Sequence, residues 1–261
     1  MIKPIQTLTG AFCLSGKTAL VTGGGKGIGA AIALAMAESG ANIAIADIAE
    51  AAETIAALSK FGGACKSYLA DVSSLPAVER LVDDAWSDFG GIDILVNNAG
   101  TSAVGDLLDD DGLADWNRVM GLNLGGNANM IAAVGKRMRD AGAGGAIINI
   151  SSISSEFVVR TQNMSAYCVS KAGINSLTKC MAYELGKYDI RVNAIAPAFT
   201  NTDLSKMIPP DQVAYINGTF ALGRFNEPIE IGALAVYLAS PASAQITGAV
   251  IPINGGFALS V

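Results

Sequence analysis

Histidine is absent from this sequence, and cysteine, aromatic and charged residues are all sparse. Without histidine, the commonest metal ligand and the commonest general base are both missing. The four cysteines show no spacing typical of a metal site: they are Cys13, Cys65, Cys168 and Cys180. We therefore expect no bound metal, and we expect reduced thiols in a cytoplasmic protein.

Basic residues are too few for several classes of partner. Lys and Arg number 17 against 23 Asp and Glu, which gives a net charge of −6. Nucleic acid requires a basic face, and no basic run suggests a membrane surface, so we expect neither partner. Charged residues interrupt each apolar stretch that could span a bilayer. The N-terminal "MIKPIQTLTGAF" lacks the continuous apolar segment of a secretory signal.

Apolar strand-like runs alternate with helix-like stretches along the chain, which is 51% hydrophobic. The predicted strands cover residues 18–23, 41–47, 66–72, 93–100, 145–152, 190–197 and 248–256. Strands separated by helices predict an α/β fold, with a doubly wound seven-stranded parallel sheet and helices on both faces. We expect one domain over residues 1–261. Within it, residues 1–16 would be a loose extension and residues 200–222, without a clear strand, a substrate lid.

A glycine-rich stretch, "TGGGKGIG" at residues 22–29, stands between a predicted strand and a predicted helix. Gly23 and Gly27 would allow a tight turn, and Gly29 would let the helix pack closely on the sheet. The helix N-terminus would then offer free N–H groups to a pyrophosphate. Strand-to-helix turns use glycine in other contexts as well, so the loop alone leaves a purely structural role open.

Asp47 ends the second predicted strand, close to the distance expected of a ribose-binding carboxylate. Such a carboxylate accepts hydrogen bonds from ribose hydroxyls and repels a 2′-phosphate. No arginine follows it, because the next residues are Ile48, Ala49 and Glu50. This predicts NAD rather than NADP, although Asp47 could instead, or also, cap the next helix.

Polar residues also end other predicted strands, at Asp71, at Asn97 to Gly100, and at Ser151 and Ser152. Ligands of open α/β sheets lie outside the carboxyl ends of the strands, so these positions indicate a site. In "SAYCVSKAG", Tyr167 and Lys171 lie four residues apart and share a helix face. An ammonium there would lower the tyrosine pKa, and a bound nicotinamide cation would lower it further. Taken alone, the pair is also compatible with an ordinary solvated helix face.

Together, these motifs resemble the classical short-chain dehydrogenase/reductase (SDR) family, with a Rossmann fold, over about residues 14–257. The resemblance rests on "TGGGKGIG", "NNAG", a serine after the fifth strand, "YCVSK" and "PAFTNT", in that order. It implies that Tyr167 is the general acid/base, that Lys171 lowers its pKa and holds the nicotinamide ribose, and that Ser152 orients the substrate. It also implies that Asn123 holds a water in a proton relay, although Asn123 could simply satisfy buried backbone groups.

The resemblance implies a cofactor site of many residues. They are Gly23, Gly25, Lys26, Gly27, Ile28, Gly29, Asp47, Ile48, Asp71, Val72, Asn98, Ala99, Gly100, Ile150, Tyr167, Lys171, Pro197, Ala198, Thr200 and Thr202. The two threonines would approach the nicotinamide carboxamide or, alternatively, cap a helix. Ala198 departs from the family's usual Pro-Gly, and its methyl is disfavoured if its φ is positive.

The spacing before Tyr167 is the second departure, because Ser152 precedes it by fifteen residues, two more than is common. Ser154 fits the common spacing by count, but we favour Ser152 because it follows the strand. The longer loop is similar to a branch of the family that acts on sugar alcohols. Polar loop residues could bind such a substrate or be plain surface: Glu156, Arg160, Gln162 and Asn163. We assign Ser154, Asn163 and Phe199 to the substrate.

The lid carries apolar residues that could equally cover an apolar ketone: Met207, Ile208, Val213, Tyr215 and Phe220. We therefore expect an NAD-dependent oxidoreductase of a secondary alcohol, with a sugar alcohol or small polyol as the first candidate substrate. A 3-oxoacyl or other ketone reductase is the alternative, and a non-catalytic NAD-binding sensor is the alternative of another class. The family resemblance also implies a homotetramer built on helices at about 115–140 and 165–186, where small residues such as Gly125, Gly126, Ala172 and Gly173 permit close approach or serve the core.

Overall fold

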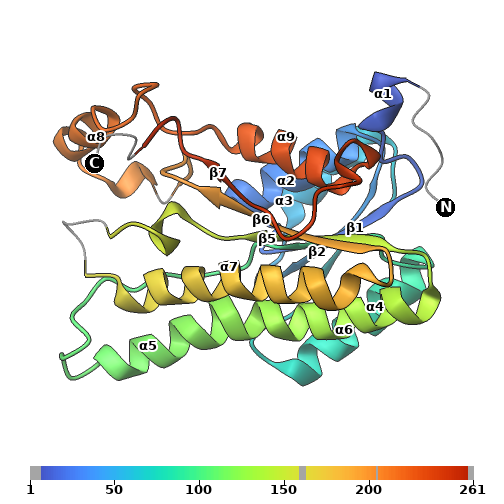
Figure 1. Ribbon diagram of the computed structural model, residues 1–261, viewed down its shortest axis with the longest axis horizontal. Helices are drawn as coiled ribbons and strands as arrows, with labels where there is room; N and C mark the ends of the chain where they lie inside the picture. The colour runs from blue at the N-terminus through green and yellow to red at the C-terminus, as the bar shows by residue number, and fades with distance from the viewer. Residues whose placement is uncertain (1–6, 159–162, 204, 258–261) are drawn as a thin grey trace.

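The computed structural model describes residues 7–158, 163–203 and 205–257. Within these ranges every helix is too short or too polar to traverse a lipid bilayer. Parallel strands form a seven-stranded sheet in the order β3-β2-β1-β4-β5-β6-β7 (Figure 1). The strands are β1 (Thr18–Thr22), β2 (Asn42–Asp47), β3 (Cys65–Leu69), β4 (Ile94–Asn97), β5 (Gly145–Ile150), β6 (Ile190–Pro197) and β7 (Val250–Ile253). The predicted doubly wound Rossmann sheet is confirmed, with its switch point between β1 and β4.

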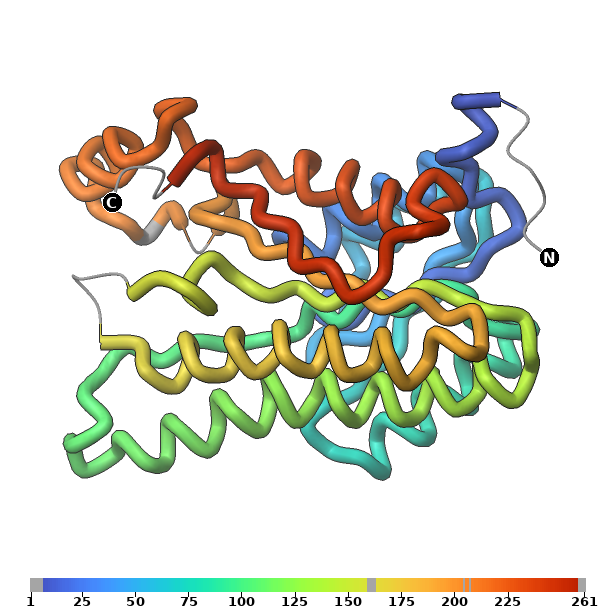
Figure 2. The backbone as a smooth tube through the Cα atoms, in the orientation of Figure 1, coloured from blue at the N-terminus to red at the C-terminus, as the bar shows by residue number. Residues whose placement is uncertain are grey.

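Helices cover both faces of this sheet, as parallel strands joined by crossovers require. One layer contains α1 (Leu8–Ala11), α2 (Gly27–Glu38), α3 (Ala52–Leu58) and α9 (Pro228–Ala239) (Figure 1). The other layer contains α4 (Leu75–Phe89), α5 (Gly112–Met120), α6 (Gly126–Ala141) and α7 (Ser165–Gly186). Figure 2 shows the segment after α9 running back along the sheet toward α8 (Pro210–Asn217).

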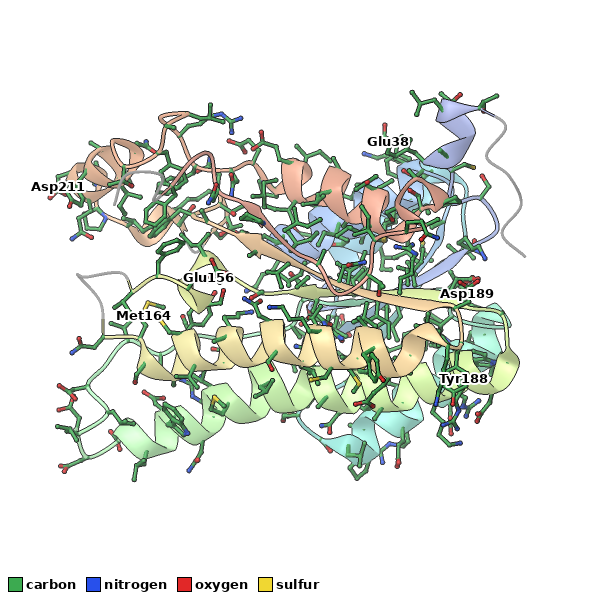
Figure 3. All side chains as sticks on the ribbon, viewed as in Figure 1. Glu38, Glu156, Met164, Tyr188, Asp189 and Asp211 are labelled. Atoms are coloured by element: carbon green, nitrogen blue, oxygen red, sulfur yellow. The ribbon has the colours of Figure 1, made fainter. Side chains whose placement is uncertain are left out.

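The carboxyl ends of the central strands lie at one end of the molecule. Glu156 follows β5 and Met164 precedes α7, and both lie toward the end that carries Asp211 of α8 (Figure 3). Tyr188 and Asp189, beyond the end of α7, mark the opposite end. Side chains from separate crossovers therefore converge at the edge of the sheet where the strands end, at the same end of the molecule as α8.

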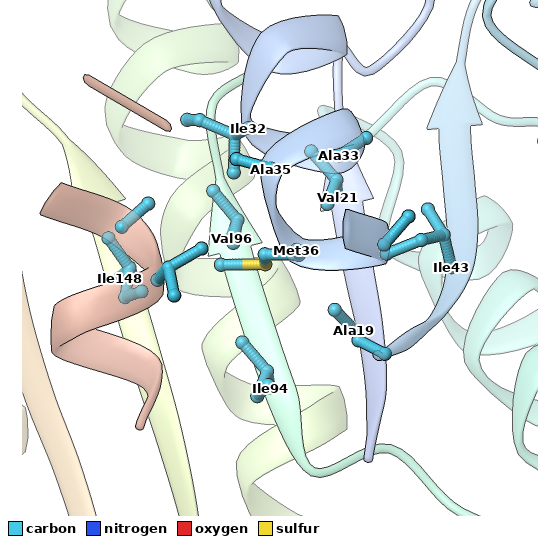
Figure 4. Packing of buried hydrophobic residues seen from close by; sticks show 14 of the residues in the cluster. Ala19, Val21, Ile32, Ala33, Ala35, Met36, Ile43, Ile94, Val96 and Ile148 are labelled. Carbon is cyan, nitrogen blue, oxygen red and sulfur yellow. The ribbon is translucent and has the colours of Figure 1, made fainter. Parts of the chain in front are cut away.

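Alternate residues of each strand enter different cores, because successive side chains of a strand point to opposite faces. Ala19 and Val21 of β1 pack with Ile32 and Met36 of α2 (Figure 4), whereas Leu20 joins the core beneath α4 and α6. All five residues are fully buried. Burial on both faces explains why the strands read as continuous apolar runs rather than as alternating ones.

The expectation of a loose N-terminal extension is wrong for its last residues. Thr7 caps α1 by accepting a hydrogen bond from the Gly10 N–H at 3.1 Å. Leu14 is only 1% exposed and belongs to the core between α2 and the sheet. Its N–H donates to the Ser39 carbonyl at 2.8 Å. The apolar residues here are not spaced as in a strand or a long helix, so the sequence gives little signal, although the burial of Leu14 ties the segment to the domain.

The predicted lid, residues 200–222, is less irregular than expected. It contains a 3₁₀ turn, η4 (Ser205–Met207), and the helix α8. Pro210 begins α8, where the missing N–H costs nothing. Ile208, Val213 and Phe220 pack with a cluster around Phe225, whereas Tyr215 is 72% exposed and does not cover the site.

Several boundaries differ from the predictions. Strands expected at 66–72, 93–100 and 248–256 are shorter, and they end at Leu69, Asn97 and Ile253. The helix expected at 115–140 begins at Gly112 and contains a π-helical turn, η2 (Gly121–Gly125). A Cβ on Gly126 would lie 2.8 Å from Val72 Cγ2, and one on Gly173 would lie 2.8 Å from Leu124 Cδ2. Packing within the chain thus accounts for both glycines.

Candidate active site

The glycine-rich turn connects β1 to α2 and is closely packed against the loop after β4. Gly23 has φ +62°, and a Cβ there would lie 3.0 Å from the Ala99 Cα. A Cβ on Gly29 would lie 2.1 Å from the Gly23 carbonyl oxygen, so no larger residue fits. Lys26, the residue that precedes α2, places no side-chain cap on the helix. The first N–H groups of α2 are therefore able to donate hydrogen bonds to a phosphate oxygen.

A threonine that the sequence predictions missed holds this turn to the "NNAG" loop. The Thr22 Oγ accepts hydrogen bonds from the N–H groups of Asn98 and Ala99, each at 3.0 Å. The Asn98 amide nitrogen donates in return to the carbonyls of Thr22 and Gly23, at 3.0 and 2.9 Å. A hydroxyl between a buried strand and a glycine turn was the available sequence signal.

Asp47 is fixed by backbone donors on both oxygens. Its Oδ2 accepts from the Gly25 N–H at 3.0 Å and its Oδ1 from the Ala49 N–H at 3.3 Å. The residue before α3 is Ala51, which makes no side-chain cap, so Asp47 does not cap that helix. Each carboxylate oxygen keeps further acceptor capacity beside the glycine turn, which fits the two hydroxyls of a ribose.

Tyr167 and Lys171 share one face of α7, at the carboxyl end of β5. The Lys171 Nζ lies 5.5 Å from the Tyr167 ring centroid and donates to the Ile150 carbonyl at 2.8 Å. Gly100 and Asn123 lie against the same group: a Cβ on Gly100 would be 3.7 Å from the Lys171 Nζ and 3.2 Å from the Asn123 Oδ1. The structure therefore brings these four predicted residues together.

Burial changes both acid–base groups. Burial raises the pKa of Tyr167, and a hydrogen bond with Ser152 opposes this rise only in part. Burial lowers the pKa of Lys171 to about 8. In the protein alone, desolvation rather than the Lys171 ammonium thus dominates the pKa of Tyr167. The sequence-based prediction that Lys171 lowers the pKa of Tyr167 is therefore wrong for the protein alone, where that pKa is raised.

Ser152, rather than Ser154, faces Tyr167. The Ser152 Oγ accepts from the Ser154 N–H at 3.1 Å, which leaves its own proton free for another acceptor. Ser154 lies in the 3₁₀ turn η3 (Ile153–Ser155), where it is 9% exposed. The hydrogen bond that acts on the pKa of Tyr167 comes from Ser152. This geometry favours Ser152 as the serine of the site.

Asn123 is fully buried in η2, and its side chain binds protein groups. Its Oδ1 accepts from the Thr101 N–H at 2.8 Å, and its Nδ2 donates to the Thr101 carbonyl and to the Ser170 Oγ at 2.9 and 3.0 Å. Its carbonyl accepts from the Asn127 Nδ2 at 2.7 Å. The side chain of Asn123 thus satisfies the backbone N–H and carbonyl of Thr101, which is the simpler alternative.

The remaining predicted cofactor residues surround the same strand ends. Asp71 accepts from the N–H and hydroxyl of Ser73 and forms a turn before α4. Val72 is buried, and Ile48 is 78% exposed beside Asp47. In the described chain Asp189 is the one non-glycine residue with positive φ, so the methyl of Ala198 causes no backbone strain.

The base of the lid lies against the glycine turn. Thr200 donates to the Ala198 carbonyl at 3.0 Å, and the Thr202 N–H donates to the Ser205 Oγ at the start of η4. The Thr202 Cγ2 would lie 3.6 Å from a Cβ on Gly27. Gly27, itself at φ +59°, thus faces the lid.

Of the predicted substrate residues, Phe199 stacks on Phe225 with 5.3 Å between ring centroids, and Asn163 is exposed. Arg160 and Gln162 lie outside the described residues. A pocket that was not predicted adjoins the start of α7. It is lined by Ser165 and Ala166 and by a loop whose carboxylates are Asp106, Asp109, Asp110 and Asp111. The acidic run "DLLDDDG" was its sequence signal.

Comparisons with known proteins agree with this geometry. The family model described as "Enoyl-(Acyl carrier protein) reductase" matches residues 23–258. The chain is 42% identical to a D-threitol dehydrogenase of Mycolicibacterium smegmatis, with 95% of each chain covered. It is 40% identical to a 3-alpha-(or 20-beta)-hydroxysteroid dehydrogenase of Mycobacterium tuberculosis, covering 93% of this chain and 90% of the relative. A crystal structure of a short-chain type dehydrogenase/reductase from Mycobacterium marinum is 35% identical and superposes with a TM-score of 0.91, over 98% of this chain and 100% of the other.

Proposed function

The chain belongs to the short-chain dehydrogenase/reductase family of oxidoreductases, which act on CH–OH groups, and from this premise we propose an NAD-dependent dehydrogenase of a sugar alcohol or small polyol. The observation that carries this proposal is the convergence of Ser152, Tyr167 and Lys171 at the carboxyl end of β5. The intact set also argues against a non-catalytic sensor, for which none of these side chains would be needed.

The proposed reaction removes a hydride from the substrate carbon and a proton from its oxygen. A bound NAD would supply the acceptor for the hydride. Tyr167, as phenolate, takes the hydroxyl proton, and it returns that proton when the ketone is reduced. Ser152 accepts from the Ser154 N–H and keeps its own proton for the Tyr167 side of the site. There it donates to the substrate oxygen and orients it toward Tyr167. Lys171 places a cation near the phenol and favours its ionised form.

Asp47 supports NAD over NADP, because a 2′-phosphate would meet a carboxylate already fixed by Gly25 and Ala49. Replacing Asp47 with serine should raise the KM for NAD roughly 10- to 100-fold, the worth of a hydrogen bond to a charged group. Turnover with NADP should appear or increase in the same variant. Glu50→Ala, which removes an exposed carboxylate three residues away, should change neither value. An unchanged preference for NAD over NADP in Asp47→Ser would contradict the role assigned to Asp47.

The pocket beside α7 supports an uncharged substrate. Its four loop aspartates, Asp106, Asp109, Asp110 and Asp111, create a negative potential that disfavours carboxylates and phosphorylated acyl carriers. Hydroxyl groups, in contrast, can donate hydrogen bonds to such carboxylates. The similarity to a D-threitol dehydrogenase supports a polyol in the same way.

A cyclic or steroid-like alcohol is the second candidate, favoured by the aromatic cluster at the lid. Phe199, Phe220, Phe225 and Phe257 contact one another, with Phe220 and Phe257 5.4 Å apart between centroids. The cluster also packs on Ile153, next to Ser152, and so offers an apolar wall near the site. The similarity to a hydroxysteroid dehydrogenase supports this candidate.

Reduced-nicotinamide absorbance separates these candidates. Purified protein is mixed with NAD, or in parallel with NADP, and with polyols, cyclic secondary alcohols and 3-hydroxyacyl thioesters. We expect turnover of polyols with NAD. Turnover confined to cyclic alcohols would replace the polyol by the second candidate, and turnover confined to thioesters would remove both. Preference for NADP would contradict the role of Asp47.

We propose further that the chain acts as one domain in the cytoplasm and assembles as a homotetramer. A shallow groove between α6 and α7, lined by Ala128, Ala132, Leu177 and Met181 among others, supports an interface on these helices. Sedimentation of the purified protein determines the assembly.

A further inference from the structure

We infer that Asn175 is a positioning residue that fixes the backbone around Ser152, an inference that rests on the proposed role of Ser152. Asn175 lies on α7, one helical turn after Lys171. Its side chain faces the end of β5 and the turn η3, two segments that flank Ser152. Neither the glycine turn nor the lid contributes to this group of residues.

A chain of short hydrogen bonds passes through Asn175. The Ser151 hydroxyl lies 2.6 Å from the Asn175 Oδ1 and donates to it. The Asn175 Nδ2 donates to the Ser155 Oγ at 2.8 Å. The Ser155 hydroxyl in turn donates to the Ser152 carbonyl at 2.6 Å. The residues before and after the site serine are thus held by one side chain of α7.

The same segment is anchored from the sheet and from the helix backbone. The Ser151 N–H donates to the Ile195 carbonyl of β6 at 2.7 Å, which extends the sheet register by one residue beyond β5. The Ser151 Oγ also lies 3.2 Å from the carbonyl of Lys171. Asn175 therefore couples the position of Ser152 to the helix that carries Tyr167 and Lys171.

An amide side chain suits this position. Ser151 supplies a donor and requires an acceptor, whereas Ser155 uses its proton on Ser152 and requires a donor. An amide carries one oxygen and one NH₂ group and so satisfies both sides. An aspartate would present acceptors to both sides, and the Ser155 proton would then be drawn away from the Ser152 carbonyl.

The consequence for the reaction is geometric. The Ser152 Oγ receives the Ser154 N–H, and both belong to the turn whose position Ser155 fixes. If that turn shifts, the Ser152 proton no longer points at the substrate oxygen near Tyr167. Small displacements of a positioning group lower rates by one to two orders of magnitude. Asn175 touches neither the reacting atoms nor the glycine turn, so its loss should change kcat and leave cofactor binding intact.

The test is a double-mutant cycle on the full-length protein. Asn175→Ala should lower kcat about 10-fold and leave the dissociation constant of NADH, from its fluorescence, unchanged. Ser176→Ala, the neighbouring exposed position on α7, should lower neither. Ser155→Ala breaks the same chain and should reproduce the effect of Asn175→Ala, which keeps the test valid if Asn175→Ala fails to fold. In a Ser152→Ala background, Asn175→Ala should cause no further loss, because it acts through Ser152.

Two outcomes overturn the inference: wild-type kcat in Asn175→Ala and Ser155→Ala, or losses that multiply in the Ser152→Ala/Asn175→Ala variant. Failure of the proposed function is seen separately. If Ser152→Ala itself keeps wild-type turnover, the role of Ser152 is wrong, whatever Asn175 does. Melting temperatures of all variants show that each is folded at the assay temperature.

Discussion

Replacing Tyr167 with phenylalanine should lower kcat by roughly 10²–10⁴-fold, the contribution of a positioned acid–base group. The ring remains and can fill the same space on α7, so the protein should fold and bind NADH as before. Only the hydroxyl that we propose to exchange a proton with the substrate is lost. Tyr183→Phe is the matched control, because Tyr183 lies on the same helix and is 90% exposed. Steady-state kinetics of alcohol oxidation compare the two variants.

The pH dependence of kcat/KM of the wild-type protein should also report the titration of Tyr167. Oxidation needs the phenolate, so kcat/KM for the alcohol should rise with pH until Tyr167 is ionised. Ketone reduction needs the phenol and should fall over the same range. Burial raises the pKa of Tyr167 in the protein alone. The positive charge of a bound oxidised nicotinamide would lower it, so the phenol should titrate at lower pH once the oxidised cofactor is bound. Substantial turnover in Tyr167→Phe with an unchanged pH profile would assign the acid–base role elsewhere.

The sheet could be predicted from sequence because parallel strands buried on both faces are apolar throughout. Leu20 and Val21 enter different cores, yet both are fully buried, so the strand leaves a continuous apolar run in the sequence. The positions of the motifs could be predicted for a related reason. Strand ends determine where chains turn, and the glycines at Gly23 and Gly29 are required by contacts of 3.0 Å or less.

Other features depend on neighbours that are distant in sequence. Leu14 is a core residue only because Ser39 and the end of α2 lie beside it. Pro210 can break or begin a helix, and the packing of Val213 on the lid cluster favours the second. Asn175 looks like any polar helix residue until the fold places Ser151 and Ser155 on its two sides.

The pKa shifts of Tyr167 and Lys171 could not be predicted from the sequence either. A lysine four residues after a tyrosine suggests charge stabilisation, but the burial of Lys171 and the partial burial of Tyr167 are properties of the assembled fold. That burial raises the pKa of Tyr167 and lowers that of Lys171 to about 8. The site therefore carries an energetic cost in the absence of its ligand, as functional sites commonly do.

Lys171→Met tests this cost directly. Turnover should fall roughly 10²–10³-fold, since a charge beside the reacting phenol is lost. The melting temperature at pH 7 should rise, because a well-packed apolar side chain replaces an ammonium held in a desolvated position. Each kcal/mol gained corresponds to roughly 2–4 °C in a domain of this size. Lys179→Met, an exposed lysine on the same helix, should change neither turnover nor stability appreciably.

The stability gain should depend on pH in a defined direction. The pKa of Lys171 is lowered from 10.5 to about 8 on folding, so between these values the unfolded chain binds more protons than the folded one. Wild-type stability attributable to Lys171 therefore increases as pH rises from about 8 to 10.5, and it is lost as pH falls through 8. The advantage of Lys171→Met should be largest below pH 8 and should shrink toward pH 10. Calorimetry at pH 7 and pH 9.5 measures it, and a lower melting temperature for Lys171→Met at pH 7 would show that the Nζ–Ile150 hydrogen bond outweighs the cost of burial.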